Sequence, residues 1–202
     1  MDFGWQPAMH PGSGEPGQAW IEGNWALSEL QAVLTAVKDF SLAAGGPAAA
    51  RQAISGLTVR RIKDGVPGHN KGVLEIADYT FNQSGLRERI GPRIARVHEL
   101  AHYWDWCTGG FWSRRSGQPG SIVRAMPGAV GDETGPTWYA RTGGTVEDWA
   151  ESVASYVYQD YANILRAEND PRETVGVQPG LASRHRSFVA AQFAALSGSA
   201  SK

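Results

Sequence analysis

The run Val97–Trp104 reads VHELAHYW, and the interpretation of the whole chain starts from it. Its two histidines, His98 and His102, stand four residues apart, so a helix places both imidazoles one turn apart on one face. Two imidazoles in that position can reach a single zinc ion at about 2.0 to 2.1 Å. Glu99 lies beside them and is expected to take a proton from a zinc-bound water, whose pKa the metal lowers from about 15.7 toward about 7. The run therefore predicts a helix that carries two ligands of a zinc site.

The residues around this run separate a metal helix from a chance match. A chance match is the alternative, because few positions of the pattern are fixed. Arg96 is a charge where such helices usually carry a neutral residue. The other neighbours are uncharged and mostly bulky, as a buried helix requires: Leu100, Ala101, Tyr103 and Trp104. These neighbours favour the metal site.

Zinc in a catalytic site takes a third protein ligand and leaves the fourth position to water. A metzincin would place a glycine three residues and a histidine six residues after His102, whereas this chain has Asp105 and Thr108 there. We expect the remaining histidines to be solvated surface residues: His10, His69 and His185. A carboxylate is therefore the predicted third ligand.

Glu147 and Glu151, in the run EDWAE, are the strongest carboxylate candidates. They lie four residues apart at the start of a predicted helix, so they share one face and repel each other unless a cation lies near. The alternative is a solvated acidic patch that the helix dipole stabilises. Apolar neighbours argue against that alternative: Val146, Trp149, Ala150 and Val153. We therefore predict Glu147 as the third ligand, with Asp132 or Glu133 next in line.

Hydrophobic periodicity predicts a mixture of helices and strands. Apolar residues recur at helical spacing in four stretches: Ala26–Ala44, Arg93–Trp106 after a slow start from Leu86, a helix capped by Thr145 that runs to about Glu168, and Leu181–Leu196. Alternating, partly β-branched residues predict two strands that form a hairpin or lie as sheet neighbours: Leu57–Ile62 and Gly72–Phe81. Glycines and a proline end the first two helices, at Gly45-Gly46-Pro47 and Gly109-Gly110.

The length and composition predict one domain. The chain has 202 residues, of which 42% are hydrophobic, and this is enough for one core. We expect an irregular arm rich in Gly, Pro and Trp over residues 1–24, a single catalytic domain over 25–196 and a loose tail over 197–202. The Gly-rich loop 107–144 should border the active site, because loops of that length are usually functional.

The charges and the single cysteine exclude several functions. The 19 Lys and Arg nearly cancel the 20 Asp and Glu, so no nucleic-acid partner is expected. Cys107 stands alone, which excludes an intramolecular disulfide. It is expected to be a plain core or loop residue, the alternative being an inhibitory zinc thiolate. We expect neither a signal peptide nor a membrane partner, because the opening residues lack a basic start and an apolar run and no apolar run reaches membrane-spanning length. The protein is therefore expected to be cytoplasmic or exported by a non-Sec route, and we also expect a monomer.

The pattern HExxHxxD, followed by a Gly-rich insertion and by Glu-x-x-Ala-Glu on a second helix, resembles the gluzincin metallopeptidases, and within them the lethal-factor-like and minigluzincin types. The resemblance covers about residues 55–165. It implies an α+β, zincin-like fold with a small mixed sheet, an active-site helix and a glutamate helix. It also implies that Glu147 completes the site of one zinc ion, that Glu151 supports a ligating histidine, and that Asp105 supports a ligand or the helix end. Gly72–Phe81 would be the edge strand that pairs with extended substrate.

The segment Trp138–Thr142 resembles the tyrosine-bearing segment that precedes the glutamate helix in lethal-factor-type enzymes. There the tyrosine hydroxyl steadies the oxyanion of the tetrahedral intermediate, and the resemblance implies this role for Tyr139. The spacing from Tyr139 to Glu147 is about one residue longer than the family pattern. The alternative is a buried aromatic ring with a wet hydroxyl.

These residues are compatible with three functions. The first, which we predict, is an active zinc endopeptidase that cleaves peptide or protein substrates. The second is a metal-bound binding or regulatory module, or a toxin domain, of the same fold without productive geometry. The third is a latent protease whose Trp-rich arm or tail occupies the cleft. The first and second share every ligand, so the sequence does not separate them.

Overall fold

The structure is a computed structural model that describes residues 20–22, 25–63, 68–70, 73–78, 91–109, 121–126, 135–159, 181 and 183–199. Within these ranges the chain mixes helices and strands and is mostly helical. Several expectations fall outside them: most of the arm, His10, Asp132 and Glu133, and the helix predicted beyond residue 159.

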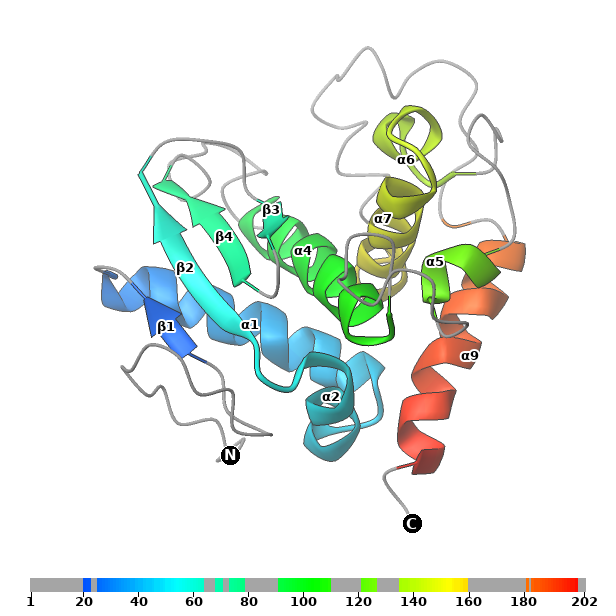
Figure 1. The fold of residues 1–202 in the computed structure, drawn as a ribbon, viewed down its shortest axis with the longest axis horizontal. Coiled ribbons are helices and arrows are strands. Elements are labelled where there is room, and N and C mark those ends of the chain that lie inside the picture. The colour runs from blue at the N-terminus through cyan, green and yellow to red at the C-terminus, as the bar shows by residue number, and fades with distance from the viewer. Residues whose placement is uncertain are drawn as a thin grey trace.

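The described strands lie in one mixed sheet with the order β1-β2-β4-β3 (Figure 1). β1 (Trp20–Glu22), β2 (Thr58–Ile62) and β4 (Val73–Ala77) are parallel, whereas β3 (Gly68–Asn70) runs antiparallel to β4. The strands predicted at 57–62 and 72–81 are therefore confirmed as sheet neighbours, and they pair in parallel rather than as a hairpin.

Two short strands correct the sequence prediction. β4 pairs with β2 on one side and with β3 on the other, so Val73–Ala77, within the predicted strand, is not at the edge of the sheet, and among the described strands β3 is. The arm over residues 1–24 is not irregular throughout, because Trp20–Glu22 pairs with β2. Strands of three residues are too short to show a period of two, and the partner strand determines their conformation.

Helices α1 (Leu27–Ala43) and α2 (Pro47–Ile54) cross over between β1 and β2. α1 agrees with the predicted helix. Gly45 and Gly46 then adopt φ values of +88° and +129°, which favour glycine, and the chain turns sharply. Pro47 was expected only to end the first helix, but it also begins α2, because the first position of a helix needs no N–H donor. α2 lies outside the predicted helices, because its alanines give a weak apolar pattern.

The two helices that carry the predicted metal ligands pack side by side (Figure 1). α4 (Gly91–Cys107) lies beside β3 and β4 and packs along α7 (Thr145–Val157), and α9 (Ser183–Ser199) packs against both α7 and α2. The short helices α5 (Ile122–Ala125) and α6 (Trp138–Thr142) lie within the predicted loop. None of the helices in the described ranges is long and apolar enough to cross a membrane.

The ends of two helices differ from the prediction. α7 ends at Val157, well before Glu168, and its N-cap is Gly144 rather than Thr145. α9 continues to Ser199, so the predicted loose tail is helical over its first three residues. Ser197 Oγ donates a hydrogen bond to the carbonyl oxygen of Ala44, 2.8 Å away. This contact with the turn after α1 holds the end of α9 against the domain.

An aromatic cluster joins the four long helices. The Trp104 ring of α4 packs on Phe40 of α1, on Trp149 of α7 and on Phe193 of α9, with ring centroids 5.6, 5.3 and 4.9 Å apart. All four side chains are buried. Packed aromatic rings of this size dominate core energetics, so the cluster fixes α4 and α7 relative to each other.

Candidate metal centre

One buried hydrogen bond aligns the two helices that carry the predicted ligands. Trp149 Nε1 of α7 donates to the carbonyl oxygen of Ala101 in α4, 2.9 Å away. Ala101 precedes His102, and Trp149 lies between Glu147 and Glu151. The bond therefore sets the register in which the acidic face of α7 meets the histidines of α4.

The structure brings the three predicted ligands together as a group that could hold a metal ion: His98, His102 and Glu147. The two Nε2 atoms lie 3.0 Å apart, and Glu147 Oε2 lies 3.1 Å from His98 Nε2 and 3.3 Å from His102 Nε2. A zinc tetrahedron with bonds of about 2.05 Å has edges of about 3.3 Å. The three donor atoms are therefore spaced nearly as one face of such a tetrahedron.

Carboxylates make this group favourable for a cation. Burial alone would lower the pKa of His98, but contacts with Glu147 and Glu151 raise it well above 6.5. Burial alone would raise the pKa of Glu147, but the approach of His102 and His98 brings it below its usual range. Both shifts have one cause, which is the close approach of carboxylate oxygens and imidazole nitrogens. The donor set and its surroundings thus fit a divalent metal.

Glu151 contacts Nδ1 of His98, the ring nitrogen that does not face the metal group, and the resemblance implies this contact. Its Oε1 lies 2.7 Å from His98 Nδ1, and it is almost fully buried. A carboxylate in this position accepts a hydrogen bond from Nδ1–H, so Nε2 is the ring nitrogen that is left to bind a metal. Thr137 Oγ1 donates to the other carboxylate oxygen, 2.8 Å away.

Glu99 is buried next to the group and does not belong to it. Its Oε2 has no hydrogen-bond partner among the described residues. Burial raises the pKa of Glu99, and His98 and His102 partly oppose that rise. A buried carboxylate without a partner is costly, and groups of this kind are concentrated at functional sites.

Tyr139 also lies at the group. Its ring stacks near His98 with centroids 6.1 Å apart, and 46% of the residue is exposed. Burial, the charges of Glu147, Glu99 and Glu151, and a hydrogen bond with Glu147 raise the pKa of Tyr139 to about 12. The hydroxyl therefore keeps its proton at neutral pH. The alternative of a buried ring does not hold, because almost half of the residue is exposed.

Asp105 is buried, and its carboxylate connects α4 to α5. Asp105 Oδ1 accepts hydrogen bonds from Val123 N at 3.0 Å and from Ser121 Oγ at 3.2 Å. These bonds match the expected support of a helix end, and they anchor part of the loop that follows α4. The described contacts do not join Asp105 to His98 or His102 directly.

The expectation that His185 is a solvated surface residue is wrong. His185 is fully buried on α9, and its Nε2 lies 3.1 Å from Asp148 Oδ2. Its local sequence is polar, and only the packing of α9 on α7 buries it. The side chain of His69 is not among those that the structure describes.

Cys107 is half-buried beside Tyr103 and packs against the core, as expected for a plain core or loop residue.

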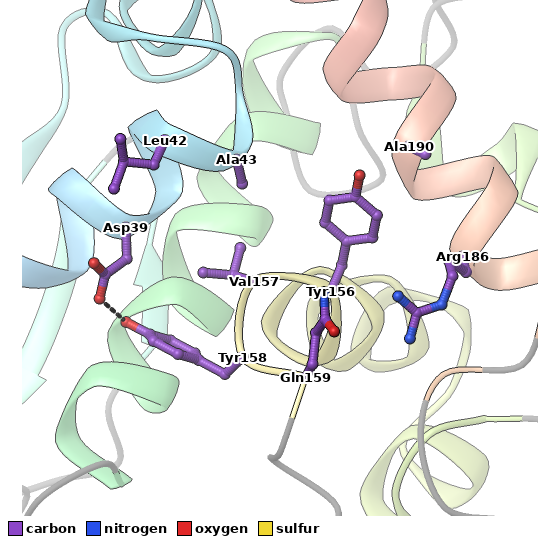
Figure 2. Close-up of a pocket in the computed structure, with 9 residues that line it drawn as sticks. All are labelled: Asp39, Leu42, Ala43, Tyr156, Val157, Tyr158, Gln159, Arg186 and Ala190. Atoms are coloured by element: carbon purple, nitrogen blue, oxygen red, sulfur yellow. Dashed lines mark hydrogen bonds between the residues drawn. The ribbon is translucent and has the colours of Figure 1, made fainter.

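A cavity of about 650 Å³ lies at the other end of α7 (Figure 2). Its walls come from α1, α9 and the end of α7. Tyr158 donates a hydrogen bond to Asp39 Oδ2, 2.8 Å away, on one side, and Arg186 lies on the other. None of the predicted site residues lines it. The cavity is therefore separate from the metal group.

Thr137 was not among the predicted site residues, although its side chain contacts both Glu151 and the backbone of α6. The signal available was a threonine just before a short helix, which is typical of an N-cap. Its second contact depends on α7, fourteen residues away in the chain.

Comparisons of the chain with protein families, with curated proteins and with solved structures find no match.

Proposed function

We propose that this chain is a zinc-dependent endopeptidase of the gluzincin type. The observation that carries the proposal is the convergence of His98, His102 and Glu147, whose three donor atoms lie 3.0 to 3.3 Å apart. Glu99 lies beside them with a buried oxygen that has no described partner. A structural histidine cluster would not require such a carboxylate.

The donor set favours zinc among the common metals. Two imidazoles and one carboxylate are typical of catalytic zinc sites, whereas calcium and magnesium prefer oxygen ligands alone. Bound there, zinc would supply a Lewis acid that polarises the scissile carbonyl and lowers the pKa of water. Glu147 and His102 are not fully buried, with side-chain exposures of 22% and 11%, so the group is in part exposed to solvent.

Glu99 is suited to move the proton in this reaction. In hydrolysis the water oxygen bonds to the carbonyl carbon, the C–N bond breaks, and one proton passes from water to the leaving amine. Glu99 accepts that proton and then donates it to the nitrogen. Its raised pKa brings the carboxylate closer to the range in which both steps are efficient.

Tyr139 is suited to stabilise the negative charge that develops on the carbonyl oxygen. Its hydroxyl remains protonated, because its pKa is about 12. An oriented hydroxyl donor of this kind stabilises the transition state more than the ground state. The partial exposure of Tyr139 leaves room for a peptide beside it.

Metal analysis joined to peptide-library cleavage tests this proposal. The purified chain is expected to hold about one zinc ion and to cleave peptides, and a chelator should abolish cleavage until zinc is restored. Glu75→Gln changes a half-buried carboxylate in β4 to an amide, so it is the matched control for Glu99→Gln. It should bind zinc and cleave peptides like the wild type. Stoichiometric zinc without cleavage would favour a metal-bound binding module, and absence of zinc binding would contradict the proposal.

A further inference from the structure

We propose that Thr137 is a positioning residue that couples the imidazole of His98 to the helix that carries Tyr139. This inference rests on the proposed function, because it concerns the same metal group. Thr137 is 1% exposed and lies between α6 and α7. Its hydroxyl contacts both helices, and each contact constrains the other.

The donors and acceptors in this chain of hydrogen bonds have a fixed order. The backbone N–H of Ala140 can only donate, so Thr137 Oγ1 accepts from it, at 3.0 Å. The single proton of the hydroxyl then remains for Glu151 Oε2, at 2.8 Å. Glu151 accepts this bond and offers its other oxygen to His98 Nδ1, at 2.7 Å.

This order determines the tautomer of His98. Because Thr137 donates to Glu151, the carboxylate is stabilised as an acceptor, and Nδ1 keeps its proton when a metal takes the place of a proton on Nε2. Nε2 is then the nitrogen that His98 offers to a metal held together with His102 and Glu147. The hydroxyl of Thr137 thus helps to prepare a ligand that it does not touch.

The same hydroxyl holds the start of α6. Thr137 is the N-cap of this helix, and its bond to Ala140 N fixes the first turn, which contains Tyr139. A helix of five residues has few bonds of its own, so its cap controls its position more than in a long helix. Loss of the hydroxyl should therefore weaken metal binding and displace Tyr139 together.

A double-mutant cycle in zinc affinity tests the first half of the inference. Thr137→Val keeps the side-chain volume and should weaken zinc binding about 10-fold in chelator competition, whereas Glu151→Gln should weaken it about 10 to 100-fold. The double variant should bind no more weakly than Glu151→Gln alone, because Thr137 acts through that carboxylate. Thr142→Val is the matched control, since it removes an exposed α6 hydroxyl that donates to Trp138 O, and its affinity should equal that of the wild type.

Thr137→Ser restores the hydroxyl and should bind zinc within about twofold of the wild type, even if Thr137→Val does not fold. In cleavage, Thr137→Val and Tyr139→Phe should both lower kcat more than they raise KM, and their effects should not add. Wild-type zinc affinity in Thr137→Val, failure of Thr137→Ser to restore binding, or additive effects in the Glu151 cycle would each overturn the positioning role. A wild-type chain that does not bind zinc would instead contradict the proposed function.

Discussion

Helix α7 presents two clusters of carboxylate and histidine on two of its faces. On one face Glu147 and Glu151 meet His98 and His102 of α4. On another, Asp148 meets His185 of α9, 3.1 Å away, and accepts a hydrogen bond from Ser152 Oγ at 3.3 Å. Both faces use residues four positions apart, so the spacing alone does not distinguish them.

The two clusters differ in how their polar atoms are paired and in their access to solvent. Asp148 contacts both Ser152 and His185, and all three residues are almost completely buried, although His185 Nδ1 has no partner among the described residues. In the first cluster two Nε2 atoms and one carboxylate oxygen converge, and two of the three residues are partly exposed. Three convergent donor atoms with access to solvent indicate a metal site, whereas a single carboxylate–imidazole contact that is closed to solvent indicates a structural contact.

The largest expected effect is on zinc content. Glu147→Gln, His98→Ala and His102→Ala should each reduce the metal from about one ion per chain to near zero, because each removes one of three ligands. Asp148→Asn, one residue from Glu147 on the other face, should keep its zinc. Elemental analysis of the purified variants measures this difference. Full zinc content in Glu147→Gln would place the third ligand elsewhere, with Asp132 and Glu133 next to test.

The second effect is on stability, and it should be larger for the cluster around His185 than for the metal group. His185→Ala should lower the free energy of unfolding by about 3 kcal/mol, since it leaves a cavity and removes the imidazole that contacts Asp148 Oδ2. Metal-free His98→Ala should lose less, because removal of one imidazole also relieves the close approach of two Nε2 atoms, 3.0 Å apart, that no metal then bridges. Urea unfolding of both chelated variants compares the faces directly. The distinction fails if His185→Ala unfolds like the wild type.

A smaller effect is expected at the turn before α7. A Cβ at Gly143 would lie 2.6 Å from Glu147 Cγ and 2.9 Å from Tyr139 O, so a side chain there must displace one of them. Gly143→Ala should therefore weaken zinc binding about tenfold. Gly198→Ala adds a methyl where nothing lies within 4 Å and should leave zinc affinity unchanged. Equal zinc affinities for the two variants would show that this turn does not position Glu147.

The smallest effect concerns the register between α4 and α7. Trp149→Phe keeps a large aromatic ring but loses the bond from Nε1 to Ala101 O. The free energy of unfolding should fall by about 1 kcal/mol, as is typical for one hydrogen bond. Denaturant unfolding in the presence of chelator measures this loss without a contribution from metal. No loss of stability would mean that the aromatic cluster alone sets the register.

The part of the candidate site that depends on residue spacing within one helix was predictable from the sequence. His98 and His102 share a helix face through their spacing of four, and Glu147 and Glu151 do the same within an apolar run. Both helices are found where they were predicted, although α7 ends early. The meeting of the two faces was predicted from the need for a third zinc ligand, and the family resemblance implies the same contact.

Other features were not predictable, because they depend on partners far along the chain. His185 stands in a polar stretch, and it becomes buried only through Asp148, thirty-seven residues away. Arg96 looked out of place for a buried helix, yet it is 2% exposed, and burial lowers its pKa to about 10. β1 and β3 are too short to show alternation, and they depend on the strands beside them.

The most direct test of the central claim is a comparison of Glu99→Gln with the wild type, in which zinc content and peptide cleavage are measured on the same samples. The account predicts that the variant keeps about one zinc ion per chain and loses cleavage by about 10²-fold or more, because it can no longer carry the proton. Cleavage by the variant at the wild-type rate, with zinc bound in both, would contradict the account.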